Sequence, residues 1–350
     1  MAQINKPTDY FNTVLYTGDD SSNRGITGVG FQPDLVWNKT RNQLNFNHYI
    51  FDSVRGAGKI ISSNLTNAEA DYTSEFLSLD SDGFSVTQNA GSLGINWSSG
   101  NYANWCWLAS NTTASNTDGS ITSTVSANTT SGFSIVSYTG TGANATVGHG
   151  LGVAPKMIIV KRLETADNWE VYHESLGNGT AIRLNLSDAS FSTSGRWNNT
   201  SPTSSVFSLG TATVINASGE DLIAYCFAEK KGFSKFGSYT GNGNNDGAFI
   251  YTGFKPAWVM IKRTNTSGEG WHIYDNKRNT FNLVTQILYA NTNGAEGTGS
   301  AGGDVIDMLS QGFKCRGTHG AINGSGNTYI YMAFAESPLV GTNNTPATAR

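Results

Sequence analysis

The sequence predicts an all-β protein made of three tandem, homologous units. One observation is the composition: charged residues make up 14% of the 350 residues, well below the roughly 25% of ordinary globular proteins. Gly, Asn, Ser and Thr replace them, which is typical of β-proteins with many turns. The other two observations are a repeat along the chain and the lack of any long amphipathic helical pattern.

The repeat has a fixed skeleton of an apolar strand ending in Tyr-Thr-Gly, a Gly-rich turn, a proline, a buried-looking run and a lysine. In all three copies the glycine and the proline are 15 residues apart, and the proline and the lysine are 6 apart. We expect the proline at the start of a strand, where its missing N–H costs least. The skeleton positions are Gly18, Pro33 and Lys39, then Gly140, Pro155 and Lys161, then Gly241, Pro256 and Lys262.

Further segments stay in register after the lysine. The first reads HYIFD, WEVYH and WHIYD in the three copies, the alternation expected of a half-buried strand. A later segment runs into an Asn/Thr/Ser turn, and an aromatic-apolar run closes each copy. Tryptophans at equivalent strand positions should therefore belong to the core; they are Trp37, Trp169, Trp258 and Trp271.

The repeat also divides the chain into parts. Residues 111–131 are rich in Ser, Thr and Asn and contain no aromatic residue, so we expect an extended linker with a short edge strand at Ile121–Val125. Such a linker would let the first unit hinge, whereas the short join at Glu229–Lys231 couples the other two rigidly. The parts are an arm at 1–9, disordered or docked on a partner, unit one at 10–110, the linker at 111–131, unit two at 132–230, unit three at 232–337 and an extended tail at 338–350.

Charge and hydropathy exclude several classes of protein. The net charge is −4 and no Lys/Arg block occurs, so nucleic-acid binding has no electrostatic basis. No apolar run reaches the roughly 18 residues of a membrane helix, which argues against membrane insertion. The start of the chain is polar, so we expect no signal peptide and synthesis in a cytoplasm.

Neither CxxC nor HxxxH occurs, and the equivalent Cys106 and Cys226 should be small buried residues.

No constellation satisfies the requirements of a catalytic or metal site. The run Asp80–Gly83 resembles half of a calcium loop but lacks the later bidentate glutamate. The acidic residues Glu69, Asp71 and Glu75 do not have the spacing of a glycosidase carboxylate pair. His173 aligns with two aspartates at a strand end, a position that we interpret as a solvated turn. We therefore predict no catalytic residue, no metal and no cofactor.

Two tryptophans have no counterpart in the other units. Trp97 and Trp197 lie in stretches rich in Asn and Ser. An aromatic ring exposed in a polar loop is a common platform for stacking on sugars, and a loop anchor packed on a sheet edge is the other explanation. Both residues are therefore weak candidates for a glycan-binding site.

With the repeat laid out, the chain resembles a family of structural, tail-fibre-like proteins of marine tailed bacteriophages. The resemblance covers essentially the whole chain. It implies a place, the virion, rather than a reaction, and it carries over no catalytic residues. It also implies that the units are jelly-roll or concanavalin-like β-sandwiches. The runs that carry it are DYFNTVLYTG (9–18), GVGFQPDLVWNK (28–39), LDSDGFSV (79–86), DGSITSTVSANTTSGFSIVSYTG (118–140), GHGLGVAPKMIIVK (148–161), AYCFAEKKGFSKFGSYTGNG (224–243) and YIYMAFAESP (329–338).

These observations favour a non-enzymatic virion protein, either a tail fibre or tip or a capsid decoration, that contacts the host surface. Its partners would be other virion proteins and a host glycan or receptor. Unpaired sheet edges favour a homo-oligomer, with a trimer expected by analogy with phage fibres. One alternative is a carbohydrate-binding lectin or adhesin. A weaker one is a polysaccharide depolymerase, for which the repeat offers no paired carboxylates.

Overall fold

The protein is an all-β structure, as predicted. A computed structural model describes residues 3–88, 93–341 and 346. Strand accounts for 44% of the residues and helix for 3%. The predicted tail lies mostly outside the described residues, which end with the strand at Thr328–Pro338 except for short pieces beyond it.

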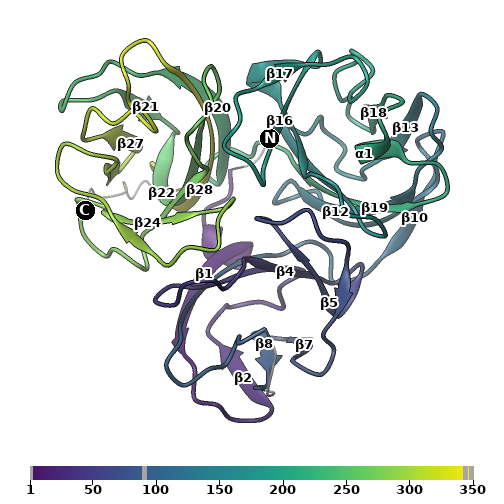
Figure 1. The fold of residues 1–350 in the computed structure, drawn as a ribbon, viewed down its shortest axis with the longest axis horizontal. Helices are drawn as coiled ribbons and strands as arrows, with labels where there is room; N and C mark the ends of the chain where they lie inside the picture. Colours follow the sequence, from purple (N-terminus) through teal and green to yellow (C-terminus); the bar gives the residue numbers. More distant parts are fainter. Residues whose placement is uncertain (1–2, 89–92, 342–345, 347–350) are drawn as a thin grey trace.

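The strands form three lobes around a common centre, with a large and a small sheet in each (Figure 1). The large sheets lie toward the centre and the small sheets toward the outside. The large sheets have the strand orders β1-β9-β3-β4-β5-β6, β10-β11-β12-β19-β14-β15-β16-β17 and β20-β28-β22-β23-β24-β25, and the small ones β2-β8-β7, β13-β18 and β21-β27-β26.

Lobe 1 comprises the 3-10 helix η1 and nine strands. These are η1 Pro7–Asp9, β1 Phe11–Thr17, β2 Arg24–Thr27, β3 Leu35–Thr40, β4 Tyr49–Asp52, β5 Gly56–Ser62, β6 Ala70–Asp71, β7 Phe76–Asp80, β8 Gly83–Val86 and β9 Asn101–Trp107.

Lobe 2 comprises ten strands, one 3-10 helix and one short α-helix. These are β10 Ala114–Asn116, β11 Ser123–Asn128, β12 Phe133–Thr139, β13 Ala145–Gly148, β14 Met157–Arg162, β15 Glu170–His173, η2 Glu174–Leu176, β16 Thr180–Arg183, β17 Phe191–Ser192, β18 Val206–Leu209, α1 Thr213–Asn216 and β19 Asp221–Phe227.

Lobe 3 comprises the last nine strands. These are β20 Ser234–Thr240, β21 Phe249–Tyr251, β22 Phe254–Arg263, β23 His272–Asp275, β24 Gln286–Tyr289, β25 Gly297–Thr298, β26 Ile306–Leu309, β27 Gly312–Cys315 and β28 Thr328–Pro338.

The large sheets are buried on both faces, which explains the continuous apolar runs of the repeat. In β3 all six residues are buried. Val36 faces the core that lobe 1 has with its own small sheet, whereas Leu35 and Trp37 face a second core at the centre. Burial on both faces removes the alternation of apolar and polar residues that a half-solvated strand shows.

The central core is shared by all three lobes. The ring of Phe334 in lobe 3 stacks on Phe11 of lobe 1, with centroids 4.9 Å apart, and meets Trp107 of that lobe at 5.6 Å. On its other side it meets Phe227 of lobe 2 at 6.1 Å. The four tryptophans predicted to be core residues all belong to this cluster, which confirms that prediction. Because its rings come from every lobe, lobe 1 is not free to hinge.

The segment predicted as a linker is part of a sheet. In 111–131, strand β11 pairs with β12 and carries β10 on its other edge, so the large sheet of lobe 2 gains two strands. Val125 is 6% exposed, and Ser126 is fully buried. The prediction of an extended linker is wrong. The low apolar content of this segment suggested a linker, but the hydroxyl groups of Ser123 and Ser126 donate to buried acceptors, which lets a polar strand be buried. The expected edge strand at Ile121–Val125 is shifted to Ser123–Asn128.

The N-terminal arm is docked on the chain itself. The amide N–H of Ile4 donates to the carbonyl of Lys231 at 3.1 Å, and the Ile4 side chain is buried in the central core. The arm then enters η1 and leads into β1. Residues 1–2 lie outside the described part of the chain.

The shared core predicts that the lobes unfold together. Replacing Phe334, which is 2% exposed, in the variant Phe334→Ala should cost about 3–5 kcal/mol, because the cavity opens against rings of all three lobes. Calorimetry should show a single transition at a lower Tm. Leu44→Ala, at a side chain that is 67% exposed, is the control and should change stability by less than about 0.5 kcal/mol. A separate early transition of one lobe would contradict the shared core.

Candidate functional site

The repeated glycines are required by close backbone packing. Each follows the strand that ends in Tyr-Thr, and a Cβ on it would lie 1.9 Å from the carbonyl oxygen of Trp97 at Gly18, 2.2 Å from that of Ala217 at Gly140 and 2.4 Å from that of Gly324 at Gly241. No other residue fits at such distances. These three positions therefore serve the fold rather than a ligand.

The repeated prolines mark the approach to a central strand. Pro33 and Pro155 each lie two residues before one, β3 and β14 respectively, rather than at its first position as predicted. Pro256 lies inside β22, where the pairing with β28 shifts register on both sides of it. An irregularity of this kind is where a strand tolerates proline.

The repeated lysines are buried without a carboxylate partner. The ammonium of Lys161 donates to the Thr66 carbonyl of lobe 1 at 3.2 Å, and that of Lys262 to the Ser187 carbonyl of lobe 2 at 3.4 Å. Lys39 bonds only to carbonyls of its own lobe. Burial lowers the pKa of all three lysines to about 8. Two of the three ammonium groups therefore tie one lobe to the next.

The tryptophans that immediately precede β15 and β23 make matching contacts between lobes through their ring N–H groups. Trp169 Nε1 donates to the Ser62 carbonyl of lobe 1 at 2.9 Å, and Trp271 Nε1 to the Arg183 carbonyl of lobe 2 at 2.9 Å. In lobe 1 the position is His48, whose Nδ1 accepts from Trp37 at 2.9 Å. The ring hydrogen is thereby assigned to Nε2.

The asparagines that stand in register along the repeat orient these rings. Asn64, Asn185 and Asn291 each accept, through the side-chain oxygen, from the backbone N–H of the ring-bearing residue at 2.9–3.0 Å. The predicted turn function of these residues thus includes a specific hydrogen bond that begins the strand.

The strand-end position that we interpreted as a solvated turn is buried in all three lobes, so that interpretation is wrong. Asp52, His173 and Asp275 are fully buried because each faces a neighbouring lobe. Asp52 accepts from Tyr225 Oη of lobe 2 at 2.7 Å, and Asp275 accepts from Trp105 Nε1 of lobe 1 at 3.0 Å.

In lobe 2 the histidine takes over this contact. His173 Nε2 lies 3.2 Å from the Tyr331 carbonyl of lobe 3, and burial lowers its pKa to about 4. It is therefore neutral near pH 7 and donates to that carbonyl. Each lobe thus bonds to the next one in a closed ring.

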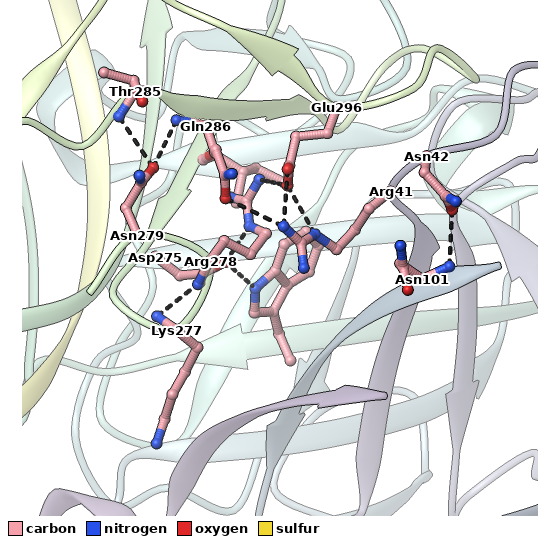
Figure 2. Close-up of polar contacts among 12 residues, drawn as sticks. Arg41, Asn42, Asn101, Asp275, Lys277, Arg278, Asn279, Thr285, Gln286 and Glu296 are labelled. Carbon is pink, nitrogen blue, oxygen red and sulfur yellow. Dashed lines mark hydrogen bonds and ion pairs between the residues drawn. The ribbon is translucent and has the colours of Figure 1, made fainter. Parts of the chain in front are cut away.

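Figure 2 shows the charged network between lobes 3 and 1. The guanidinium of Arg278 is fully buried and contacts Asp275 at 2.5 Å and Glu296 at 3.0 Å. Arg41 of lobe 1 reaches the same Glu296 at 2.9 Å. Burial by itself raises the pKa of Asp275, but the charge of Arg278 and the hydrogen bonds from Arg278 and Trp105 outweigh it, so the pKa is lowered.

The network is repeated in lobe 1 and replaced in lobe 2. Arg55, Asp52 and Glu69 form the same triad, with contacts of 2.5 and 3.0 Å. In lobe 2 the arginine and glutamate positions hold Leu176 and Ser190. The aspartate position holds His173 in lobe 2. The residue that faces this position from the next lobe differs too: Tyr225 faces Asp52 and Trp105 faces Asp275, whereas Met332 stands at the equivalent position of lobe 3, which faces His173. A methionine has no hydrogen-bond donor for a carboxylate. Lobe 2, which faces the methionine, accordingly lacks the aspartate, the arginine and the glutamate of the other two lobes.

The two glycan candidates lie in different environments. Trp197 is 1% exposed and packs against Tyr172 inside lobe 2, so its ring is not available for stacking on a sugar. Trp97 is 43% exposed and rests edge-on against Phe46, with centroids 5.2 Å apart. Its loop is held by Asn42, whose side chain donates to the Ser99 carbonyl at 2.8 Å. Only Trp97 presents an accessible ring.

The cysteines and the possible metal ligands complete the description of the reactive side chains. The three cysteines are free and buried, as predicted for Cys106 and Cys226, and burial raises the pKa of each thiol. In residues 3–88, 93–341 and 346 no group of three or more His, Cys, Asp or Glu side chains could hold a metal ion. Within the same residues, no helix has the length and apolar character to cross a membrane.

The chain belongs to the family described as Domain of unknown function (DUF7483), whose model matches residues 6–338. The matched range runs from the residue before η1 to the end of β28, so it includes all three lobes and every junction between them. No curated protein and no solved structure matches the chain.

The buried network predicts an asymmetric response to mutation. Arg278→Leu should cost about 3–5 kcal/mol, because it leaves the Asp275 carboxylate buried without its partner. Asp275→Asn combined with Arg278→Leu should recover most of that loss. The asparagine oxygen still accepts from Trp105, and the remaining carboxylate, Glu296, keeps its contact with Arg41. Chemical denaturation measures both. Lys314→Leu, which breaks the surface pair with Asp246, is the control and should cost less than about 1 kcal/mol. Equal losses in the single and double variants would refute this explanation.

The buried lysines predict a pH dependence. Between pH 8 and about 10.5, folded Lys262 has released a proton that the unfolded chain still binds. The stability of the wild type relative to Lys262→Met should therefore rise with pH in this window, by at most about 1.4 kcal/mol per pH unit. Denaturation at pH 7, 8, 9 and 10 measures the difference. Lys231→Met, at an exposed lysine, is the control. A difference that stays flat or falls over this window would contradict it.

Proposed function

We propose that this protein is a non-enzymatic structural component of a bacteriophage virion that contacts the host cell surface. It would act in a tail fibre or tip, or as a decoration on the capsid. The observation that carries the proposal is the closure of three lobes around one shared core. A body whose lobes cannot open separately suits a particle component that must keep its shape outside the cell. The runs shared with tail-fibre-like proteins point to the same place.

We further infer that each lobe is one copy of a homologous β-sandwich unit of the jelly-roll or concanavalin-like type. Each lobe has a large and a small sheet with an apolar cluster of its own, which is how sandwiches are built. Equivalent repeat positions also make equivalent contacts, as the three asparagines that begin a strand illustrate. Duplication of one unit accounts for both observations.

The closed ring leaves the outer loops as the surface available for recognition. Residues that differ between the lobes and lie outside the core, such as those around Trp97, are free to vary without loss of the fold. We propose that other virion proteins hold the body and that these loops face the host. The chain would be made in the host cytoplasm and assembled into the virion. A homotrimer remains our prediction for its assembly.

The alternative is a lectin or adhesin, and one observation favours it. The exposed ring of Trp97 lies beside Phe46 and the amides of Asn42 and Gln43, both of which donate to the carbonyl of Ser99. An aromatic face next to amides is a common arrangement for binding a sugar. On a virion this loop would serve attachment, so the two functions differ chiefly in where the protein resides.

The location in the particle tests the proposal. Mass spectrometry of purified virions should detect the protein, and cryo-electron microscopy should place a three-lobed density on the tail or the capsid. Absence of the protein from purified particles would rule out the virion role. Glycan-array binding by the isolated protein that Trp97→Ala abolishes, and that Tyr251→Ala on lobe 3 leaves intact, would then support the lectin alternative. Release of shortened glycans would instead indicate a depolymerase.

A further inference from the structure

We propose that the cleft between lobes 3 and 1 is a docking site for an extended segment of another protein, which adds to the edge of β1 as an antiparallel strand. This inference does not depend on the virion role. It rests on a difference between equivalent edges of the three large sheets.

The edge that is open in two lobes is closed in the third. Strands β1, β12 and β20 are equivalent, because each ends in Tyr-Thr before the repeated glycine. In lobe 2, β12 pairs with β19 on one side and with β11 on the other. In the described residues, β1 pairs with β9 alone and β20 with β28 alone. The chain itself thus supplies a partner to one of three equivalent edges.

Strand β11 also fills the space between lobes 2 and 1. The buried carboxylate of Asp34 in lobe 1 accepts from the backbone N–H of Ala109 at 2.6 Å and from Ser126 of β11 at 3.4 Å. Asn128 at the end of β11 donates to the Ala109 carbonyl at 3.0 Å. An added strand therefore bonds both to a sheet edge and to the neighbouring lobe.

The two equivalent spaces are open clefts. One, of about 540 Å³, lies between lobes 3 and 1 beside Phe11–Thr13; the other, of about 530 Å³, lies between lobes 2 and 3 beside Ser234 and Lys235. The residue after the repeated proline lines each space: Asp34 where β11 lies, and Ala257 and Lys156 in the clefts. All three spaces therefore have the same construction, and one of them already holds a strand.

The backbone of β1 is positioned to accept a second partner. The Tyr10 carbonyl accepts from Leu108, and the Gly18 N–H donates to Gly100. Even-numbered residues of β1 therefore bond to β9, and the N–H and C=O groups of odd-numbered residues point to the other side. The N–H of Thr13 donates there to the side-chain oxygen of Asn12 at 2.9 Å, a bond that an added strand would replace. In lobe 2, the residues equivalent to Phe11, Thr13 and Leu15 are the ones that bond to β11.

Composition distinguishes the two open edges. Strand β1 reads FNTVLYT, seven residues without a charge, a proline or a bulge, and such an edge readily pairs with another strand. Strand β20, in contrast, carries a charged residue, Lys235, and a glycine on the edge itself. Charged side chains protect an edge against pairing, so β1 is the edge that accepts a partner.

The cleft beside β1 indicates what the partner segment contains. Its lining combines uncharged residues such as Ala257 and Thr8 with the charged Lys255, Lys277 and Glu336. It also includes Phe281, which is 76% exposed. An exposed aromatic ring beside an open edge would pack against an apolar side chain of an added strand. Strand β11, which reads STVSAN and fills the equivalent space between lobes 2 and 1, is the guide to the occupant. By this analogy the occupant is a Ser/Thr-rich strand with an apolar side chain that packs on Phe281.

A synthetic peptide of residues 121–130, ITSTVSANTT, is the probe. Hydrogen exchange followed by mass spectrometry on the full chain should show protection of residues 10–18 when the peptide is added. Residues 133–139, already paired on both sides, are the internal control and should not change. Phe281→Ser should weaken peptide binding, whereas Tyr251→Ser, at the exposed aromatic ring of the other cleft, should not.

Backbone methylation tests the strand geometry. In β11 the N–H of Ser126 points to β12 and that of Val125 points away, because Ser126 lies opposite Ile135, a residue on the β11-facing side of β12. N-methylation at Ser126 should therefore weaken the peptide about tenfold, through loss of a hydrogen bond and a steric clash, and N-methylation at Val125 should have little effect.

Three results would overturn the proposal. Equal affinity of the two methylated peptides would exclude strand addition, as would the absence of protection at residues 10–18. Protection confined to residues 233–241 would show that the peptide binds at the edge of β20 and not at that of β1. A dimer of the free chain in light scattering, with residues 10–18 already protected and Phe281→Ser restoring the monomer, would make the occupant a second copy rather than another protein.

Discussion

The aromatic cluster at the centre is the constraint on which the rest of this structure depends. Each large sheet contributes rings such as Trp107, Phe227 and Phe334 to one cluster, so no lobe completes its burial alone. A sheet that is covered on both faces needs apolar residues at nearly every position, and the repeat supplies them. The three lobes behave as one folding unit because separating any of them would expose part of this cluster to water.

The polar contacts between lobes give this apolar cluster a defined geometry. Rings do not fix a register by themselves, whereas buried carbonyls, amides and carboxylates must find specific partners. Asp52, His173 and Asp275 each meet the next lobe, and the contacts run in one direction around the ring. Divergence of the repeat respects this requirement. Where the facing residue is Met332, which has no hydrogen-bond donor, the acid position holds His173 and the arginine position holds Leu176.

The residues that hold the lobes together differ from the surfaces that we propose for binding. The residues Asp52, His173 and Asp275 at the junctions are fully buried, and their hydrogen bonds hold the lobes together. In our proposals, recognition uses the outer loops, the ring of Trp97 and the sheet edge of β1. The strand addition that we propose would act through backbone pairing, and it is consistent with the proposed part in a larger assembly.

The sequence by itself determined the β class, a skeleton of fixed spacing that recurs along the chain, and the four tryptophans of the central core, because composition and fixed spacing are local properties. It also located the repeated glycines, prolines and lysines, but not the physical reasons for them. A Cβ at each glycine would lie within 2.4 Å of a carbonyl oxygen, and Pro256 sits where the strand pairing shifts register. The ammonium of Lys161 bonds to a neighbouring lobe. The tertiary structure decided that residues 111–131 form strands, that Trp197 is buried and that Asp52 is not solvated. Two of these depend on distant partners: Ser126 of β11 bonds to Asp34, 92 residues away, and Asp52 to Tyr225, 173 residues away. A linear pattern contains no information about which distant groups will face one another.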